Sequence, residues 1–269
     1  MYKYNETFFK NPETWDQKQA YFLGWLLSDG DHETSKGIRI RLKESDKRIL
    51  ELLKDIIEYT GPINYIKRNP SALGKLITNS GCKWQNRYGL TITRKSLSED
   101  LIKLNSNNEK SNNLDFPNYL HKSLIPHFLR SYYEGDGTIS YCYDKRHPNR
   151  LLFEIHLICT PIFGHTLQSI LLNELGIKTR IIKNDGSRNG NIMKNGNIYI
   201  KFGGNLAALK FFNYVYYDAQ TLLKRKFKKF LRLINYMKKR VHKKNVIETN
   251  LETTRSINLA KWLISNADY

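Results

Sequence analysis

The sequence predicts an α+β fold made of two similar halves, and a repeated motif is the main reason. One apolar helical run ends in Asp29-Gly30, and a second ends in Asp136-Gly137 about half a chain later. After each run, the hydrophobic pattern gives the same order of strand, helix, two strands and helix. Because helix, strand and glycine positions recur together in one order, we expect two copies of one unit rather than a chance alternation.

The first half is predicted to span residues 1–104. After a helix over 17–29 and a turn, the residues at 38–43 alternate between apolar and basic side chains. This alternation is typical of a half-buried strand, here with a positively charged open face. The remaining elements are a helix that Ser45 or Asp46 can cap and that closes near Gly61, strands around 62–68 and 88–93, and a helix around 96–104.

The second half is predicted to span residues 125–223, after an Asn- and Ser-rich connector at 105–124. We expect Gly61 and Gly176 to adopt a left-handed conformation at equivalent helix ends. The predicted order is a helix over 125–136, a strand around 151–158, a helix over 162–175 that ends at Gly176, strands near 179–184 and 197–202, and a helix over 205–216.

A basic helical tail is predicted over residues 224–269. Residues 224–244 contain eleven Lys and Arg and no acid. Apolar residues recur among them at helical spacing. A basic run is usually a solvated face, but one without acids on a basic protein favours a helix that contacts phosphates.

The net charge predicts a polyanionic partner. The 269 residues include 44 Lys and Arg against 25 Asp and Glu, which gives a formal charge of +19. A membrane surface is the alternative polyanion, but no run approaches the roughly 18 apolar residues of a spanning helix. The amino-terminal residues have no apolar signal segment. We therefore expect a nucleic acid as the partner, no membrane, and a protein that is not secreted and stays in the cytoplasm of a bacterial or phage-infected cell or in an organelle matrix.

Small residues occur four apart in both repeated helices. Gly24 and Ser28 share one face of the first, and Ser131 and Gly135 share one face of the second. Small residues at this spacing let two helix backbones approach closely. We therefore expect the two helices to pack against each other.

The two aspartates are predicted to hold a divalent cation. Asp29 and Asp136 end their helices, where the macrodipole disfavours a negative charge, and two converging carboxylates repel each other. Packing alone does not require this arrangement, so a positive charge should offset it. Mg²⁺ fits, because one or two carboxylates with phosphate oxygens and water commonly hold it. Gly30 and Gly137 are expected to give a left-handed exit from each helix.

These residues resemble the motif of the LAGLIDADG homing endonucleases, in the single-chain, two-motif, free-standing form. Asp29 and Asp136 match the final acid of the motif, and Gly30 and Gly137 its last glycine. Gly24 matches the central glycine, where the second copy has Ser131. The earlier acid of the motif is replaced by Leu27 in the first copy and is Glu134 in the second. The resemblance covers roughly residues 17–225.

The resemblance implies a specific architecture and activity. Each half would follow the order αββαββα, with antiparallel sheets that form a DNA-binding saddle and the two motif helices packed at the interface. The protein would be a monomer that cuts both strands of a long, partly asymmetric DNA target in intron or mobile-element homing, leaving short 3′ overhangs. Asp29 and Asp136 would bind Mg²⁺, or another divalent cation such as Mn²⁺, at the scissile phosphates.

The resemblance also implies one basic residue near each active site. Lys110 matches in the first half, and in the second half Lys224 is favoured over Lys226. Their expected role is to polarise water and to neutralise charge that develops on the phosphate. Other basic residues are expected to contact DNA, where Arg and Lys can read guanine edges in the major groove. They are Arg39, Arg41, Lys43, Lys201, Lys226 and Lys228.

A second class of function is an intron RNA maturase or a non-cleaving DNA-binding regulator with the same fold. Catalytically inactive relatives often lose one motif acid. Both acids are present here, which favours the nuclease.

Overall fold

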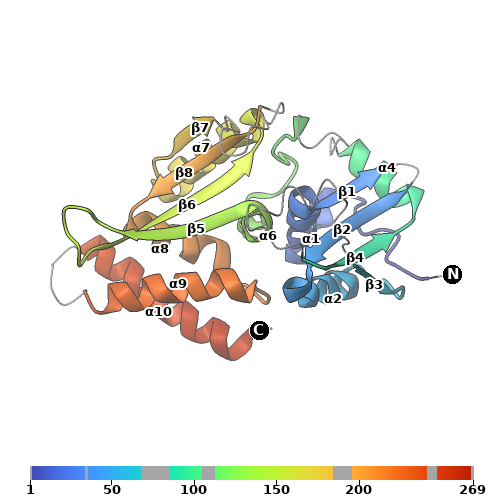
Figure 1. Ribbon diagram of the computed structural model, residues 1–269. Coiled ribbons are helices and arrows are strands. Elements are labelled where there is room, and N and C mark those ends of the chain that lie inside the picture. The colour runs from blue at the N-terminus through green and yellow to red at the C-terminus, as the bar shows by residue number, and fades with distance from the viewer. Residues whose placement is uncertain are drawn as a thin grey trace, which may run out of the picture.

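The computed structural model describes residues 2–33, 36–67, 85–104, 113–183, 196–240 and 247–267. It contains two four-stranded antiparallel sheets, each packed against helices, with α1 (Gln17–Asp29) and α6 (Ile125–Asp136) side by side between them (Figure 1). The predicted α+β class with two similar halves is therefore confirmed. Within the described ranges, no helix is both long and apolar enough to cross a membrane.

The first sheet has the strand order β1-β2-β4-β3. Its buried face carries Ile38, Ile40 and Leu42, and the basic residues between them lie on the opposite face, as the alternation predicted. Helices α2 and α4 pack against the buried face. The elements are β1 (Gly30–Glu33), β2 (Gly37–Lys43), α2 (Lys47–Ile56), β3 (Ile63–Ile66), β4 (Arg87–Ile92) and α4 (Lys95–Lys103), with short 3-10 turns at Pro12–Thr14 and Glu44–Asp46.

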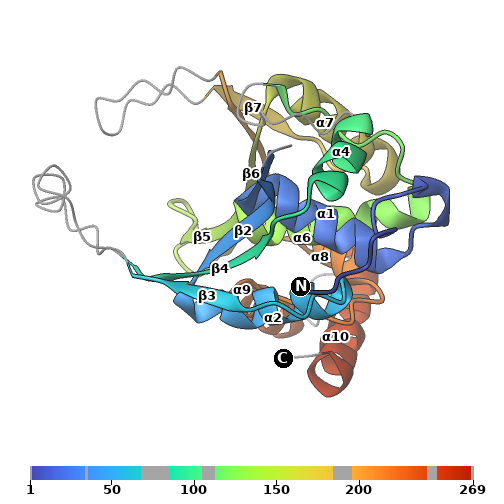
Figure 2. The same ribbon diagram turned by 90° about the vertical axis from the view of Figure 1, so that its right-hand side faces the viewer.

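The second sheet repeats this topology with the order β5-β6-β8-β7. Helices α7 and α8 cover one face, and the opposite face has no described helix against it. Figure 2 shows the two sheets diverging from the paired helices toward one side of the molecule. The elements are β5 (Gly137–Tyr143), β6 (Leu151–Cys159), α7 (Pro161–Leu175), β7 (Arg180–Lys183), β8 (Ile198–Gly203) and α8 (Asn205–Tyr216), with a 3-10 turn at Lys122–Leu124 before α6.

The helix ends correct two predictions about glycine. Gly176 is left-handed with φ 62°, as expected, but α2 ends earlier than Gly61. There Glu58 takes the left-handed conformation with φ 56°, and Tyr59 N donates to Lys54 O at 2.9 Å. This is the hydrogen bond of a Schellman motif, formed here without glycine. Gly30 and Gly137 are also not left-handed: both are extended, with φ −97° and −85°, because each already begins a strand.

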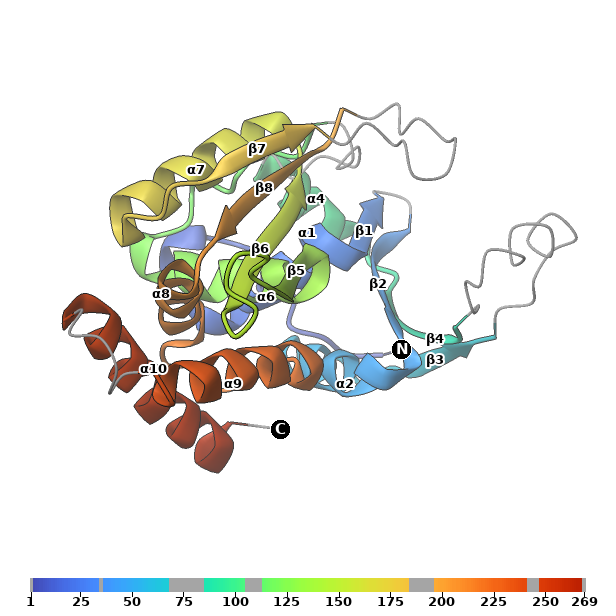
Figure 3. The same ribbon diagram turned by 60° about the vertical axis from the view of Figure 1, so that its left-hand side comes forward.

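The basic tail contains two helices, α9 (Lys224–Lys238) and α10 (Ile247–Asn266). Helix α9 packs on α8 and β5 through a buried stripe that includes Phe227, Phe230 and Leu233. Its first turn approaches α2 of the other half (Figure 3), and α10 packs on α8 and α9. Helix α9 is therefore part of the core of the second half as well as a basic segment.

Candidate active site at the paired helix ends

Helices α1 and α6 meet along the small residues that the sequence placed on one face of each. A Cβ atom on Gly24 would lie 2.5 Å from the carbonyl oxygen of Phe128 and 2.9 Å from Tyr132 N. A Cβ atom on Gly135 would lie 2.5 Å from Ser28 Cβ. Real side chains cannot occupy such positions, so the close approach depends on these small residues and the packing prediction is confirmed.

Replacing Gly24 by alanine should therefore destabilise the protein. The new methyl group would meet the Ser131 hydroxyl and two backbone atoms of α6, and that backbone can yield only if the two helices move apart. Overpacking of this kind costs about 1–3 kcal/mol, so thermal unfolding should shift down by several degrees. Gly203→Ala is the matched control, because its new Cβ would meet only the Glu154 side chain, at 3.2 Å. Equal melting temperatures for the two variants would contradict this account.

The close packing brings the end of α1 against the end of α6. Asp29 Oδ2 lies 2.5 Å from the position that a Cβ on Gly135 would take, one residue before Asp136. The Asp29 residue is exposed, but the neighbouring helix ends partly desolvate its carboxylate, and this desolvation raises its pKa. Lys226 and Arg225 oppose the increase in pKa, whereas Asp46 adds to it. Three charged groups from other elements therefore act on Asp29.

The raised pKa of Asp29 has a consequence for stability without metal. A carboxyl group whose pKa is raised in the folded state destabilises the fold when it ionises. The free energy of unfolding therefore falls as the pH rises through the raised pKa. Asp29→Asn removes this cost and should raise the melting temperature of metal-free protein slightly at pH 7, since solvent screens an exposed charge. The gain should shrink as the pH is lowered toward about 4, the ordinary pKa of Asp. A lower melting temperature for the variant at pH 7, measured by calorimetry in EDTA, would contradict this expectation.

Lys226 lies at the junction of the two helix ends. Its Nζ donates to the carbonyl oxygens of Tyr133, of Gly135 at 3.3 Å and of Gly137 at 2.6 Å. Burial, and secondarily Arg225, lowers its pKa to about 7, while Glu134, Asp29 and Asp136 act in the opposite direction. The ammonium group therefore binds carbonyls on both sides of Asp136, where α6 ends and β5 begins, and lies in the field of both aspartates.

The position of Lys226 corrects the sequence prediction. Lys226 was expected at the DNA surface, but it is only 4% exposed, so in this structure it is not available to a phosphate. Lys224, the favoured active-site lysine, is the exposed first residue of α9. The helical spacing indicates this burial. Lys226 lies on the same face of α9 as Phe230, Leu233 and Met237, so it belongs to the buried stripe of the helix.

The ammonium also supplies part of the positive charge that the two aspartates were expected to require. The sequence predicts a divalent cation in this role. It does not predict the contact between Lys226 and the helix ends, because about 90 residues separate them in the chain.

Arg225 links α9 to the first half. Its Nε donates to Asp46 Oδ2 at 3.1 Å, and Lys43 Nζ lies 4.0 Å from the same oxygen. Asp46 is 5% exposed and precedes α2, yet its side chain makes no capping hydrogen bond there. Asp46 was predicted only as a possible cap, whereas the structure uses it as an ion-pair partner between the halves.

Glu134 holds four elements together beside the site. Its carboxylate is fully buried and accepts hydrogen bonds from Tyr21 OH at 2.9 Å, Tyr216 OH at 3.0 Å and Leu223 N at 2.8 Å. Burial raises its pKa, and Arg130 is the largest opposing influence. Because Leu223 directly precedes α9, Glu134 fixes the point from which Arg225 and Lys226 project.

The donor set at the helix ends fits a hard divalent cation. Asp29 and Asp136 offer carboxylate oxygens, the ligands that Mg²⁺ prefers. Among the residues that the structure describes, no three His, Cys, Asp or Glu side chains form a group that could hold a metal ion. A cation here would therefore complete its shell with water and with oxygens of a bound substrate.

The remaining predicted residues lie mostly on the uncovered sheet faces. Arg39 is paired with Asp31, with Nε to Oδ1 at 2.9 Å, and Lys201 with Glu154 at 2.9 Å. Arg41 is exposed on β2 and Lys228 on α9, whereas Lys43 is half-buried beside Asp46. Lys110 lies outside the described residues.

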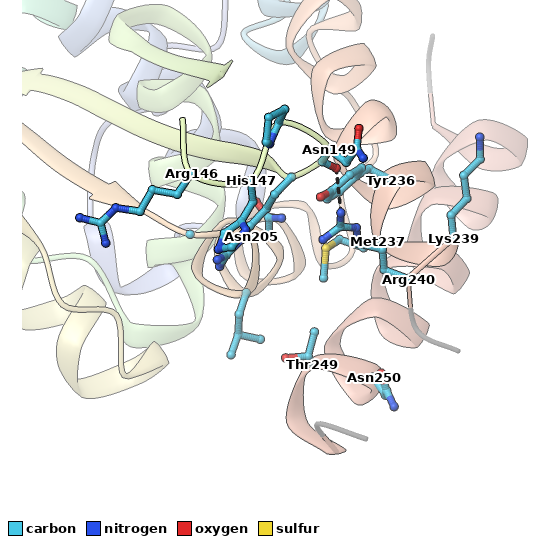
Figure 4. Close-up of a pocket in the computed structure, with 14 residues that line it drawn as sticks. Arg146, His147, Asn149, Asn205, Tyr236, Met237, Lys239, Arg240, Thr249 and Asn250 are labelled. Atoms are coloured by element: carbon cyan, nitrogen blue, oxygen red, sulfur yellow. Dashed lines mark hydrogen bonds between the residues drawn. The ribbon is translucent and has the colours of Figure 1, made fainter. Parts of the chain in front are cut away.

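A cavity of about 1060 Å³ lies elsewhere, between the turn that joins β5 to β6, the start of α8, and helices α9 and α10 (Figure 4). Its polar groups hold this turn in place: Arg240 Nη2 donates to Asn149 O at 2.7 Å, and Leu151 N donates to Tyr236 OH at 2.8 Å. In Figure 4, Arg146 and Lys239 point away from the centre of the cavity. None of the predicted site residues lines it.

Comparison with known proteins identifies the fold. No family model matches the sequence, and no curated protein matches it either. Among solved structures, the LAGLIDADG homing endonuclease I-GzeII in complex with its DNA target is 13% identical, with a TM-score of 0.51 over 93% of this chain and 97% of that one. The homing endonuclease I-LtrWI bound to target DNA is 14% identical (TM-score 0.48; 96% and 100% covered), and the meganuclease I-AabMI bound to uncleaved DNA is 16% identical (0.49; 90% and 98%). The chain therefore has the LAGLIDADG fold.

Proposed function

We propose that this chain, which has the LAGLIDADG fold, is a site-specific homing endonuclease that makes metal-dependent double-strand breaks in DNA. The observation that carries the proposal is the meeting of the two Asp-Gly helix ends, with the buried ammonium of Lys226 between them. A protein that only needed a tight helix interface could use neutral residues there. A partly desolvated acid at this position is explained if its charge has a use.

Asp29 and Asp136 are the proposed ligands of Mg²⁺ or Mn²⁺ at the scissile phosphates. When bound, such an ion lowers the pKa of a water molecule and stabilises the leaving oxygen of a phosphodiester. The desolvated Asp29 carboxylate favours a cation, because an added positive charge offsets the cost of its ionisation.

Lys226 and Arg225 are the proposed positioning groups of the two acids. Lys226 donates to the carbonyls of Gly135 and Gly137, on either side of Asp136, and thereby fixes the segment that carries this acid. Arg225 lies near Asp29 and is itself held by Asp46. Both also place positive charge where a phosphate that gains negative charge would be stabilised.

The uncovered sheet faces are the proposed DNA surface. Helices occupy the other faces, and the net charge of +19 favours a polyanion. Both halves, with both motif acids, belong to one chain, so the protein can act on two strands as a monomer.

Selection from a random duplex library tests this proposal directly. The protein is incubated with the library in Mg²⁺, and the cut ends are sequenced; parallel reactions contain EDTA or Ca²⁺. We expect one long target cut on both strands in Mg²⁺ only. Duplex retention without cutting in any divalent metal would instead favour a non-cleaving regulator, and preferential retention of intron RNA a maturase.

A further inference from the structure

The uncovered faces of the two sheets differ at structurally equivalent positions. Strand pairing defines the equivalence: Gly30 pairs with Ile40 in the first sheet as Gly137 pairs with Leu157 in the second. The next residue along β2 is therefore equivalent to the next residue along β6. These two residues are Arg41 and Ile158.

The difference extends across three strands. In the first sheet, Arg41 lies opposite Gly89, which lies opposite Asn64. In the second sheet, Ile158 lies opposite Tyr199, which lies opposite Ile182. Directly opposite residues share one face of a sheet with their Cβ atoms about 4.5–5.5 Å apart. One half thus presents a polar row and the other an apolar row, which we call the apolar row Ile158–Tyr199–Ile182.

The apolar row does not belong to the protein core. The side chains that face the helices are the alternate ones, such as Leu157 and Ile200, both 0% exposed. Ile158 and Tyr199 are only partly buried, and Ile182 is 41% exposed. Scattered single apolar side chains are normal on a protein surface. Three in one row, on a sheet face that no described helix covers, indicate a binding surface.

Charge next to the row identifies that occupant as nucleic acid. Two residues along the strands, the neighbouring row contains His156, Lys201 and Arg180, of which Lys201 is paired with Glu154 and Arg180 is exposed. Lys183 is exposed at the end of β7. An apolar protein surface would not favour cations at the edge of its contact, but the phosphates that border a DNA groove would.

The major groove of DNA offers one apolar group to such a row. It is wide enough for a two-stranded β-ribbon, and among the base edges only thymine presents a methyl group there. Polar edges of the other bases would lose water against Ile158 and Ile182 without gaining hydrogen bonds. Arg41 and Asn64 in the other half have donors that can pair with purine edges instead.

We propose that the apolar row Ile158–Tyr199–Ile182 recognises thymine methyl groups in the part of the DNA target that lies under the second sheet. The equivalent part under the first sheet is read by hydrogen bonds from Arg41 and Asn64. The target is consequently asymmetric in base composition at equivalent positions. This inference rests on the proposed DNA-binding function, but it does not require cleavage.

Deoxyuridine substitution tests the proposal, because it removes the methyl group and keeps every hydrogen-bonding group of thymine. A duplex is selected by retention on the full-length protein in Ca²⁺, and thymines are replaced one at a time by deoxyuridine. Affinity is measured by fluorescence anisotropy. Loss of one buried methyl group should weaken binding about fourfold. We expect such losses at positions under the second sheet and none under the first.

Two adjacent isoleucines give a matched pair of variants. Ile182 lies in the apolar row, whereas Ile181 pairs with Ile200 and so points to the other face of the sheet; they are 41% and 38% exposed. Threonine keeps the β-branched shape that suits a strand. Ile182→Thr should abolish the difference between thymine and deoxyuridine at one position, and Ile181→Thr should leave it unchanged.

The outcomes separate this inference from the proposed function. In one outcome, the protein binds a selected duplex tightly and keeps the same affinity when deoxyuridine replaces any of its thymines. That result would overturn the thymine proposal and leave the DNA-binding proposal intact. Equal effects of the two isoleucine variants would also overturn it. Failure to retain any duplex would overturn both proposals, and retention without cleavage in Mg²⁺ would count against the nuclease alone.

Discussion

Asp29→Asn and Asp136→Asn should each abolish double-strand cleavage while leaving DNA affinity within a few-fold of the original protein. Asparagine preserves the shape of the side chain but removes the charge that would attract the divalent cation. Loss of a metal-ligating charge should lower the cleavage rate by at least about 100-fold, the usual cost of losing one transition-state contact. Binding should persist because the proposed DNA surface lies on the sheets.

The measurement compares cleavage of supercoiled and linear target with binding in Ca²⁺. Asp55→Asn is a suitable control, since this carboxylate is exposed on α2. If one variant nicks a single strand and the other nicks the opposite strand, each half acts on its own strand. Full double-strand cleavage by either variant would refute the assignment of these acids.

Lys226→Met should also reduce cleavage by about 100-fold or more, whereas Lys224→Met should have a small effect. Methionine keeps the length of the side chain but removes the ammonium that donates to the carbonyls of Tyr133, Gly135 and Gly137. The segment that carries Asp136 would then lose its position. The pair of variants decides between the lysine that the sequence favoured and the one that the structure places at the site.

A stability measurement distinguishes the role of Lys226 from a general packing defect. A lysine whose folded-state pKa is lowered to about 7 binds fewer protons in the folded state than in the unfolded state between pH 7 and the ordinary lysine value. The free energy of unfolding should therefore rise between pH 7 and about pH 9.5, below the titration of tyrosines. Lys226→Met should remove this slope. A slope that is equal in both proteins would show that Lys226 is charged throughout.

The elements with strong periodicity could be predicted from the sequence. The alternation around Ile40 and around Ile155 gave both the strands and their buried faces, and the spacing of Gly24 and Ser28 gave the helix interface. These patterns are local, because each residue type directly reflects which side of its own element is buried.

The elements that depend on distant partners could not be predicted in this way. The residues of β1, from Gly30 to Glu33, have no apolar alternation and form a strand by pairing with β2. Glu58 replaces glycine at the end of α2 because local hydrogen bonds hold its conformation. Lys226 reaches the paired helix ends from about 90 residues beyond α6, a contact that only the tertiary structure reveals.

The crossed ion pair between Arg225 and Asp46 limits how the two halves can be recombined. Arg225 follows the second half in the chain, but its partner is buried in the first. A chimera that joins this first half to a foreign second half would strand the Asp46 carboxylate without its guanidinium. To be as stable as the parent protein, such a chimera should need either the first turn of α9 from this chain or a neutral residue at position 46.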